Sequence, residues 1–243
     1  MRSLHFTPAY LQKSERRTIF GLKYRQMLKD NPQTATVGDE DIPLQWIDRR
    51  NDIPNRTKLL GRTIDLMAQG EGKDWQNLPA LMTGLKGSKA VPDEQTMSMI
   101  VRKAVRAGRV GVIVQCLQQS EHTGVTLKRE EVLEKVIWGL HDVAQMNDWS
   151  EEAVQKALKS AKQVSLMLEM EEHGGGRFMR KRDPRTRPEV VGVFLELAAV
   201  YAYKHQDGKD VDGSVSVYAE RLMGCIGGQA QVRSISAFAI LMV

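Results

Sequence analysis

The sequence contains little cysteine and no long hydrophobic run, and each shortage excludes a class of protein. Its 243 residues include two cysteines, Cys116 and Cys225, without a CxxC motif or a matching pair of histidines. This pattern argues against a disulfide framework or a zinc site, and both residues suit core positions of helices in a reducing compartment. The longest apolar runs, 190–200 and 237–243, fall short of the roughly 20 residues that a membrane-spanning helix requires. We therefore expect no bound metal and no membrane partner.

The common catalytic and nucleotide-binding motifs are also missing from the sequence. It contains no GxSxG nucleophile turn, no HExxH, no GxxxxGK(S/T) and no GxGxxG after a predicted strand. Paired glutamates such as Glu130 and Glu131 fall in the first turns of predicted helices, where they complement the helix dipole. The histidines lie scattered at predicted helix ends and loops: His5, His122, His141, His173 and His205. We predict no enzyme, no cofactor and no small-molecule substrate.

Four consecutive segments with helical periodicity occupy the middle of the chain. The first is opened by Asp93, and its apolar stripe is Met97, Ile100, Val101, Ala104 and Val105. Residues 107–109 break it, and a second stripe runs over 110–121. Lys128 opens the third segment 35 residues after Asp93, and the fourth runs over 151–173. Two helix pairs at this period predict a stacked helical repeat, because one pair alone cannot bury its apolar face.

The stretch "VRKAVRAGRVGVIVQCLQQSEHTGVTLKREE" resembles the pentatricopeptide repeat, whose first helix ends in a small-Gly-basic turn and whose second is followed by a short GV linker. The resemblance covers residues 92–172 and implies an all-α fold of stacked antiparallel helical hairpins. An ordinary helical hairpin with a chance spacing is the alternative. In that family a small polar residue on each first helix reads an RNA base, but the matching positions here hold Met99 and Glu134. This departure favours a protein scaffold over sequence-specific RNA recognition.

Positive charge is concentrated in two short segments. The net charge is +5, yet residues 1–30 carry seven Lys and Arg against two acids, and residues 177–187 carry six against one. The rest of the chain is therefore acidic overall. Basic residues interspersed with aromatic ones suit RNA phosphates and bases. The candidate RNA-binding residues are Arg16, Arg17, Lys23, Arg25, Arg177, Arg180, Lys181, Arg182, Arg185 and Arg187.

Each basic segment has a second interpretation. The N-terminal arm, predicted to be helical over 14–28, could be a solvated basic helix that covers the protein's own core. The basic loop 174–188 follows a helix end, begins with three glycines and ends at Pro188, which suits a helix start. This loop could be a solvated linker. Residues 1–9 have the composition of a mitochondrial targeting peptide, although the aromatic residues that follow favour a retained arm.

We predict three regions in the chain. Residues 1–56 form the basic arm and a proline-containing extended strap, which we expect to lie over the helical body or to anchor a partner. Residues 57–225 form the helical-hairpin domain, with further helices at 57–69 and 75–85 and two more after Pro188. Residues 226–243 form an apolar tail that docks on this body or on a neighbour.

The stretches "LHFTPAYLQKSERRTIFGLKYRQMLKDNP" and "DIPLQWIDRRNDIPNRTKLLGRTIDLM" resemble fungal mitochondrial ribosomal proteins of the large subunit that lack bacterial counterparts. This resemblance implies a structural component of the mitochondrial ribosome, located in the matrix, with rRNA and neighbouring ribosomal proteins as partners. One alternative is a mitochondrial translational activator or RNA-stability factor of pentatricopeptide type. A helical protein–protein adaptor is the other.

Overall fold

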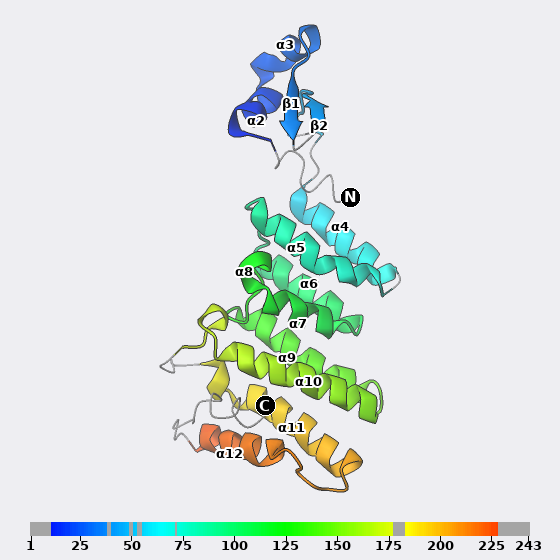
Figure 1. Cartoon of the computed structure of the whole chain (residues 1–243), viewed down its shortest axis with the longest axis vertical. Coiled ribbons are helices and arrows are strands. Elements are labelled where there is room, and N and C mark those ends of the chain that lie inside the picture. The colour runs from blue at the N-terminus through cyan, green and yellow to red at the C-terminus, as the bar shows by residue number, and fades with distance from the viewer. Residues whose placement is uncertain are drawn as a thin grey trace.

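The computed structural model describes residues 11–37, 40–48, 51–52, 55–70, 72–176 and 183–227. Most of these residues are helical, which confirms the predicted all-α class, and a two-stranded sheet lies near the N-terminus. The helices form hairpins that follow one another along the long axis of the molecule (Figure 1). None of the described helices is long and apolar enough to span a membrane.

The helical body begins at Arg56. The ends of its longer helices agree with the predicted ends to within a few residues. Its elements in chain order are α4 (Arg56–Gln69), η2 (Asp74–Asn77), α5 (Leu78–Gly87), α6 (Glu94–Arg106), α7 (Val110–Gln118), α8 (Ser120–Thr123), α9 (Glu130–Gln145), α10 (Glu151–Leu168), η3 (Glu171–His173), η4 (Pro184–Thr186), α11 (Pro188–His205) and α12 (Ser214–Ile226).

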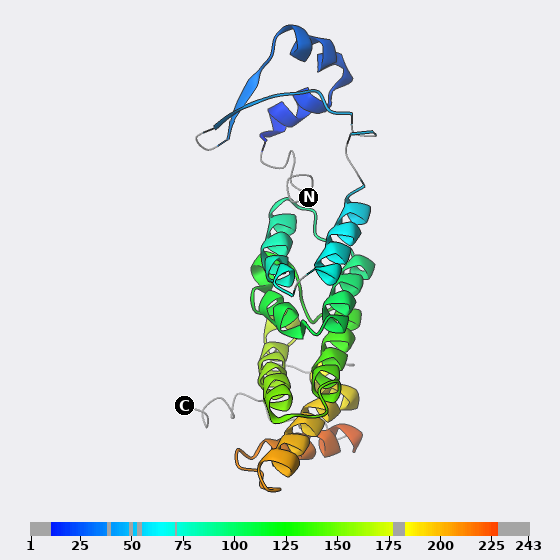
Figure 2. The same ribbon diagram turned by 90° about the vertical axis from the view of Figure 1, so that its right-hand side faces the viewer.

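The longer helices are arranged in two rows. In one row α4, α6, α9 and α11 contact one another in succession, and in the other α5, α7 and α10 do the same. Seen from the side, the central helices of the two rows appear as two columns (Figure 2). The last described helix, α12, packs against α11. Helix α9 therefore lies between α6 and α11 in the middle of its row.

Polar and glycine residues fix where the helices begin and end. Asp93 caps α6, because its Oδ1 accepts the backbone N–H of Thr96 at 2.9 Å and satisfies a donor that lacks an intrahelical partner. After α6, Gly108 adopts φ +68, and the backbone N–H of Arg109 donates to the Ala104 oxygen at 2.8 Å. Residues with a side chain rarely adopt this φ, so the glycine permits the sharp turn into α7.

The apolar stripes predicted for the central helices are buried, except for Val105, which is half-buried. Met97, Ile100, Val101 and Ala104 of α6 are at most 1% exposed. A continuous apolar cluster extends from α4 to α11. Cys116 is completely buried within it, and this burial raises the pKa of its thiol to about 12. The residue is therefore a core residue rather than a reactive thiol.

The segment between residues 11 and 48 forms a separate unit with its own small core. Its elements are α2 (Lys13–Phe20), η1 (Leu22–Tyr24), α3 (Arg25–Asp30), β1 (Thr34–Val37) and β2 (Glu40–Pro43). The strands pair antiparallel, from Thr34 opposite Pro43 to Val37 opposite Glu40. The buried core residues are Leu11, Ile19, Leu28, Ala35 and Leu44. This unit lies at one end of the helical stack (Figure 1).

Two expectations for this segment are wrong. The single helix predicted over 14–28 is interrupted at Gly21, whose extended backbone ends α2. The strap does not lie over the helical body, because Leu44, Trp46 and Ile47 pack with the small core beside α2 and α3. A backbone hydrogen bond of 2.9 Å from Ile47 N–H to the Ile19 oxygen fixes this position. The predicted tail beyond residue 227 and the arm before residue 11 lie outside the described residues.

Candidate nucleic-acid interface

Four of the predicted RNA-binding residues lie on contacting elements of the N-terminal unit. Arg16 and Arg17 come from α2, Lys23 from η1 and Arg25 from α3, and η1 contacts both of these helices. All four side chains are exposed. Within the described part of the chain, none of them forms a salt bridge. We call these four residues the N-terminal cationic cluster.

Two aromatic rings position two of the four cations of this cluster. Nζ of Lys23 lies 4.7 Å from the centroid of the Tyr24 ring, and Cζ of Arg25 lies 4.7 Å from the centroid of the Trp46 ring. Trp46 belongs to the strap, so the fold of the strap onto α2 and α3 orders the guanidinium of Arg25. Such contacts contribute about 0.5–1 kcal/mol at exposed sites and reduce the entropy lost when a phosphate binds.

Arg185, by contrast, lies inside a buried ion-pair network. Its Nε and Nη2 donate to Asp183 at 2.9 and 2.7 Å, and its Nη1 donates to Glu169 at 2.7 Å. Arg185 is 4% exposed and Asp183 is 3% exposed. The hydrogen bonds to Asp183, followed by those to Glu169, raise the pKa of the guanidinium. The expected RNA contact does not fit this placement, because every face of the guanidinium is already engaged inside the protein.

Arg187 is also paired within the protein. Its Nε lies 2.6 Å from Glu189, its Nη1 lies 2.9 Å from Glu130 and its Nη2 lies 4.0 Å from Glu134. Its side chain is only 21% exposed. The structure thus brings together the four N-terminal residues but not these two. The other four predicted residues, Arg177, Arg180, Lys181 and Arg182, lie outside the described residues.

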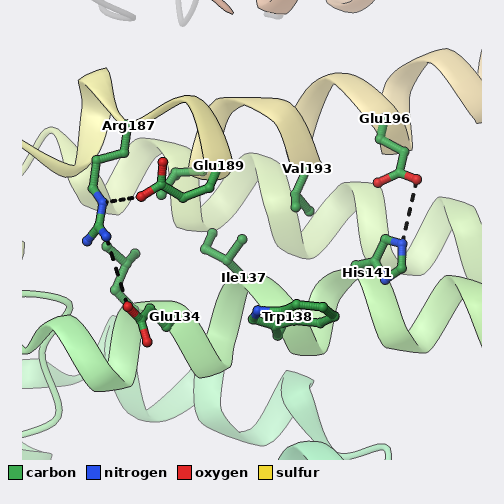
Figure 3. A pocket seen from close by; sticks show the side chains of 10 residues that line it. Glu134, Ile137, Trp138, His141, Arg187, Glu189, Val193 and Glu196 are labelled. Atoms are coloured by element: carbon green, nitrogen blue, oxygen red, sulfur yellow. Dashed lines mark hydrogen bonds and ion pairs between the residues drawn. The ribbon is translucent and has the colours of Figure 1, made fainter. Parts of the chain in front are cut away.

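The positions that would read bases in a pentatricopeptide repeat face different surroundings. Met99 is half-buried and packs against the main core. Glu134 lies on α9 near Arg187 and lines a groove between α9 and α11 (Figure 3). Neither residue combines a small polar side chain with a free surface. This geometry agrees with the expectation that these helices do not select RNA bases.

The groove was missed from the sequence, although it had one signal. Trp138 follows the buried Ile137 of the α9 stripe and is 62% exposed. A tryptophan beside the apolar stripe, rather than on it, marks a surface that needs another partner. The α11 residues that line the groove with Trp138 lie more than 50 residues later in the chain. Local periodicity therefore cannot reveal that they meet Trp138.

His173 has a structural role in the helical body. His173 is 1% exposed, and its Nδ1 accepts the backbone N–H of Leu127 at 3.3 Å. Burial lowers its pKa below the ordinary value, so the neutral ring is the stable form. In the described part of the chain no group of His, Cys, Asp and Glu side chains has an arrangement that could hold a metal ion.

Comparisons with known proteins point to translation in mitochondria. The family model described as mitochondrial ribosomal protein mS27 matches residues 1–237. The chain is also 28% identical over 240 residues to the small ribosomal subunit protein mS27 of Neurospora crassa. This similarity covers 92% of the chain but 60% of the relative, so the chain spans about 60% of that protein's length. The relative belongs to the small subunit, which overturns the choice of the large subunit made from the sequence.

Proposed function

Because the chain belongs to the mitochondrial ribosomal protein mS27 family, we propose that it is a non-catalytic structural component of the small subunit of the mitochondrial ribosome. The match over residues 1–237 carries this proposal, since it includes the N-terminal unit as well as the helical body. The matrix is the compartment in which such a subunit would assemble. Neighbouring ribosomal proteins and rRNA are the proposed partners.

The N-terminal cationic cluster is the proposed rRNA contact of the described residues. Its four cations are exposed and free of salt bridges within the described chain, and two of them are ordered by aromatic rings. Phosphates bind such groups without sequence preference. We retain Arg177, Arg180, Lys181 and Arg182 as proposed contacts on the strength of their sequence alone, and we omit Arg185 and Arg187 because carboxylates already hold them.

The helical body is proposed to act as a protein scaffold built from pentatricopeptide-like repeats. The two rows of helices and the glycine turn after α6 support this relationship. Residues 110–176 carry 11 Asp and Glu against six Lys and Arg, so this part of the body is a poor surface for phosphates. We therefore propose the division made from the sequence, with residues 1–56 as the basic arm and strap, 57–225 as the scaffold and 226–243 as an apolar tail.

Sedimentation of a mitochondrial extract tests the proposed function. We expect the protein to migrate with the small subunit in a sucrose gradient at moderate salt, and to remain there when the two subunits are separated by lowering Mg²⁺. Migration only in the light fractions would exclude a ribosomal component and favour a free RNA-binding factor or adaptor. Migration with the separated large subunit would contradict the subunit assignment.

A further inference from the structure

A groove between α9 and α11 combines an apolar floor with an exposed tryptophan. It has a volume of about 280 Å³, and its apolar lining is Leu133, Ile137, Val190, Val193 and Trp138 (Figure 3). Trp138 is 62% exposed, whereas Leu133 and Val190 are buried. The ring therefore projects beside a floor that is fixed by the main core. Exposed aromatic side chains next to a rigid apolar pocket are typical anchor points of protein interfaces.

Carboxylates surround this floor. Glu134, Glu189 and Glu196 line the groove, and their side chains are 46%, 58% and 43% exposed. The guanidinium of Arg187 also lines it, but this group is paired with Glu189 and with Glu130, which lies next to the groove. The lining thus has three carboxylates, one guanidinium and the imidazole of His141, whose Nε2 lies 3.6 Å from Oε1 of Glu196. The net charge of this lining is therefore negative, whether or not the imidazole carries a proton.

This charge decides between RNA and protein as the occupant. A tryptophan can stack on a base, but phosphates next to the three carboxylates would be repelled. A lysine or arginine on an apolar segment would be attracted instead. We propose that the groove binds a basic amphipathic segment of a neighbouring protein, with an apolar side chain against Trp138 and Ile137 and cations beside Glu134 and Glu196.

The size of the groove and the proposed setting agree with such a partner. Pockets for whole small molecules have volumes of roughly 300–1,000 Å³, so about 280 Å³ suits one or two anchoring side chains. The inference rests on the proposed function, because the neighbours of a ribosomal subunit protein bind RNA and are therefore rich in lysine and arginine. Electrostatic attraction would guide the segment, and the apolar floor would hold it.

The test measures how the purified full-length chain binds two fluorescently labelled synthetic helical peptides by anisotropy. Both peptides have leucines at i, i+3, i+4 and i+7. One peptide carries lysines on its opposite, polar face, and the second carries glutamates at the same positions. We expect the lysine peptide to bind at least tenfold more tightly. Trp138→Ala should weaken its binding roughly tenfold, and the double variant Glu134→Gln/Glu196→Gln should weaken it and reduce its salt dependence.

Matched substitutions control for general effects. Met146→Ala removes another exposed side chain at the end of α9, 74% exposed, and Glu151→Gln/Glu152→Gln removes two exposed carboxylates from α10. Both should leave binding of the lysine peptide unchanged. Failure of the lysine peptide to bind, equal binding of the two peptides, or equal affinity of the Trp138→Ala and Met146→Ala variants would overturn the proposal.

Three further outcomes separate a failure of the groove inference from a failure of the proposed function. A single-stranded RNA of 16 nucleotides that binds the chain and loses affinity with Trp138→Ala would identify the groove as an RNA site and also overturn the proposal. Loss of peptide binding with intact sedimentation on the small subunit removes the groove inference alone. Peptide binding by a protein that sediments only in light fractions supports the groove but contradicts the ribosomal function.

Discussion

Among single residues, Arg185 is the clearest case of a basic residue whose role is decided by its partners. Its neighbours along the chain are cationic and suggested an RNA contact. In the fold, however, Asp183 and Glu169 hold its guanidinium at 2.7 Å, and it also donates to the backbone oxygen of Gly176 at 3.1 Å. The residue therefore ties the segment before α11 to the end of α10.

This role predicts a large effect on stability. Arg185→Leu removes the guanidinium that Asp183 and Glu169 hold inside the protein, and breaking a buried pair costs about 3–5 kcal/mol. Arg187→Leu should cost about 1 kcal/mol or less, because Glu130 and Glu189 are 61% and 58% exposed and water screens them. Urea denaturation gives both free energies of unfolding. Equal losses in the two variants would contradict the structural role of Arg185.

His173 predicts a dependence of stability on pH. Burial lowers its pKa in the folded protein below the ordinary value of 6.5, although nearby Glu172 opposes this change. The unfolded chain therefore binds the proton more readily, and the free energy of unfolding should fall as pH drops below about 6.5. His173→Gln, which keeps an acceptor for Leu127 N–H, should show a flatter profile between pH 7.5 and 5.5. Parallel profiles for the two proteins would rule out this contribution.

The difference between Arg185 and the N-terminal cations could not be read from the sequence. Arg16 and Arg185 share a basic local context, but only Arg185 meets Glu169, the residue that follows α10. The ion pair with Glu169 joins residues 16 apart and leaves no local pattern, although the other partner, Asp183, lies two residues before Arg185. The exposure of Arg16, Arg17, Lys23 and Arg25 agrees with the predicted basic arm, and their contact with RNA stays a prediction.

Among the secondary-structure elements, the sequence predicted best those with a long apolar period. Helices α6, α9 and α10 begin and end close to the predicted positions, because several turns of burial and clear caps agree with one another. Strands β1 and β2 have four residues each and are too short to produce a distinct alternation. The two-stranded sheet and the interruption at Gly21 were therefore missed.

The packing of α9 against α6 and α7 gives a test of this element. A Cβ at Gly139 would lie 2.7 Å from Cγ2 of Val105 and 3.2 Å from Cγ2 of Val110. Gly139→Ala should therefore force the helices apart and destabilise the protein by about 1–3 kcal/mol. Gly111→Ala in α7 meets no atom within 4 Å and should stabilise by up to about 1 kcal/mol through helix propensity.

Thermal or urea unfolding of the two alanine variants measures this contrast. Both substitutions place the same methyl group in a helix, so their difference isolates the contact with Val105 and Val110. Opposite signs are expected. A stabilising effect of Gly139→Ala would show that α9 packs less closely against Val105 and Val110 than the structure indicates.

At the scale of the whole molecule, residues 1–30 carry a surplus of five positive charges and residues 110–176 a surplus of five negative charges. The N-terminal cationic cluster lies on the unit at one end, whereas the groove between α9 and α11 presents carboxylates. The sequence located the N-terminal cluster from its concentration of basic residues, but Arg185 and Arg187 of the second basic segment are held by carboxylates. The sequence did not predict the groove, because the groove is formed by α9 and α11, which lie far apart in the chain. It did not predict the subunit either, because the subunit was identified by comparison with a related protein.

The cationic cluster predicts a specific change in RNA binding. Replacing Arg16, Arg17, Lys23 and Arg25 with glutamine should reduce the slope of log K against log salt by up to about 3, since each phosphate contact contributes about 0.7 for a single strand. The matched control replaces four exposed cations of the helical body, Lys58, Arg62, Lys156 and Lys159. Filter binding to small-subunit rRNA measures both, and equal reductions would show that the cluster has no special role.

The most direct test of the account is crosslinking mass spectrometry on isolated mitochondrial small subunits. We predict that ultraviolet crosslinks to rRNA map to residues 11–30, which contain the N-terminal cationic cluster, and that lysine-directed crosslinks join residues 57–225 to neighbouring proteins. RNA crosslinks concentrated on α9 and α11, with none in residues 11–30, would contradict the division between an RNA-binding end and a protein-binding helical body.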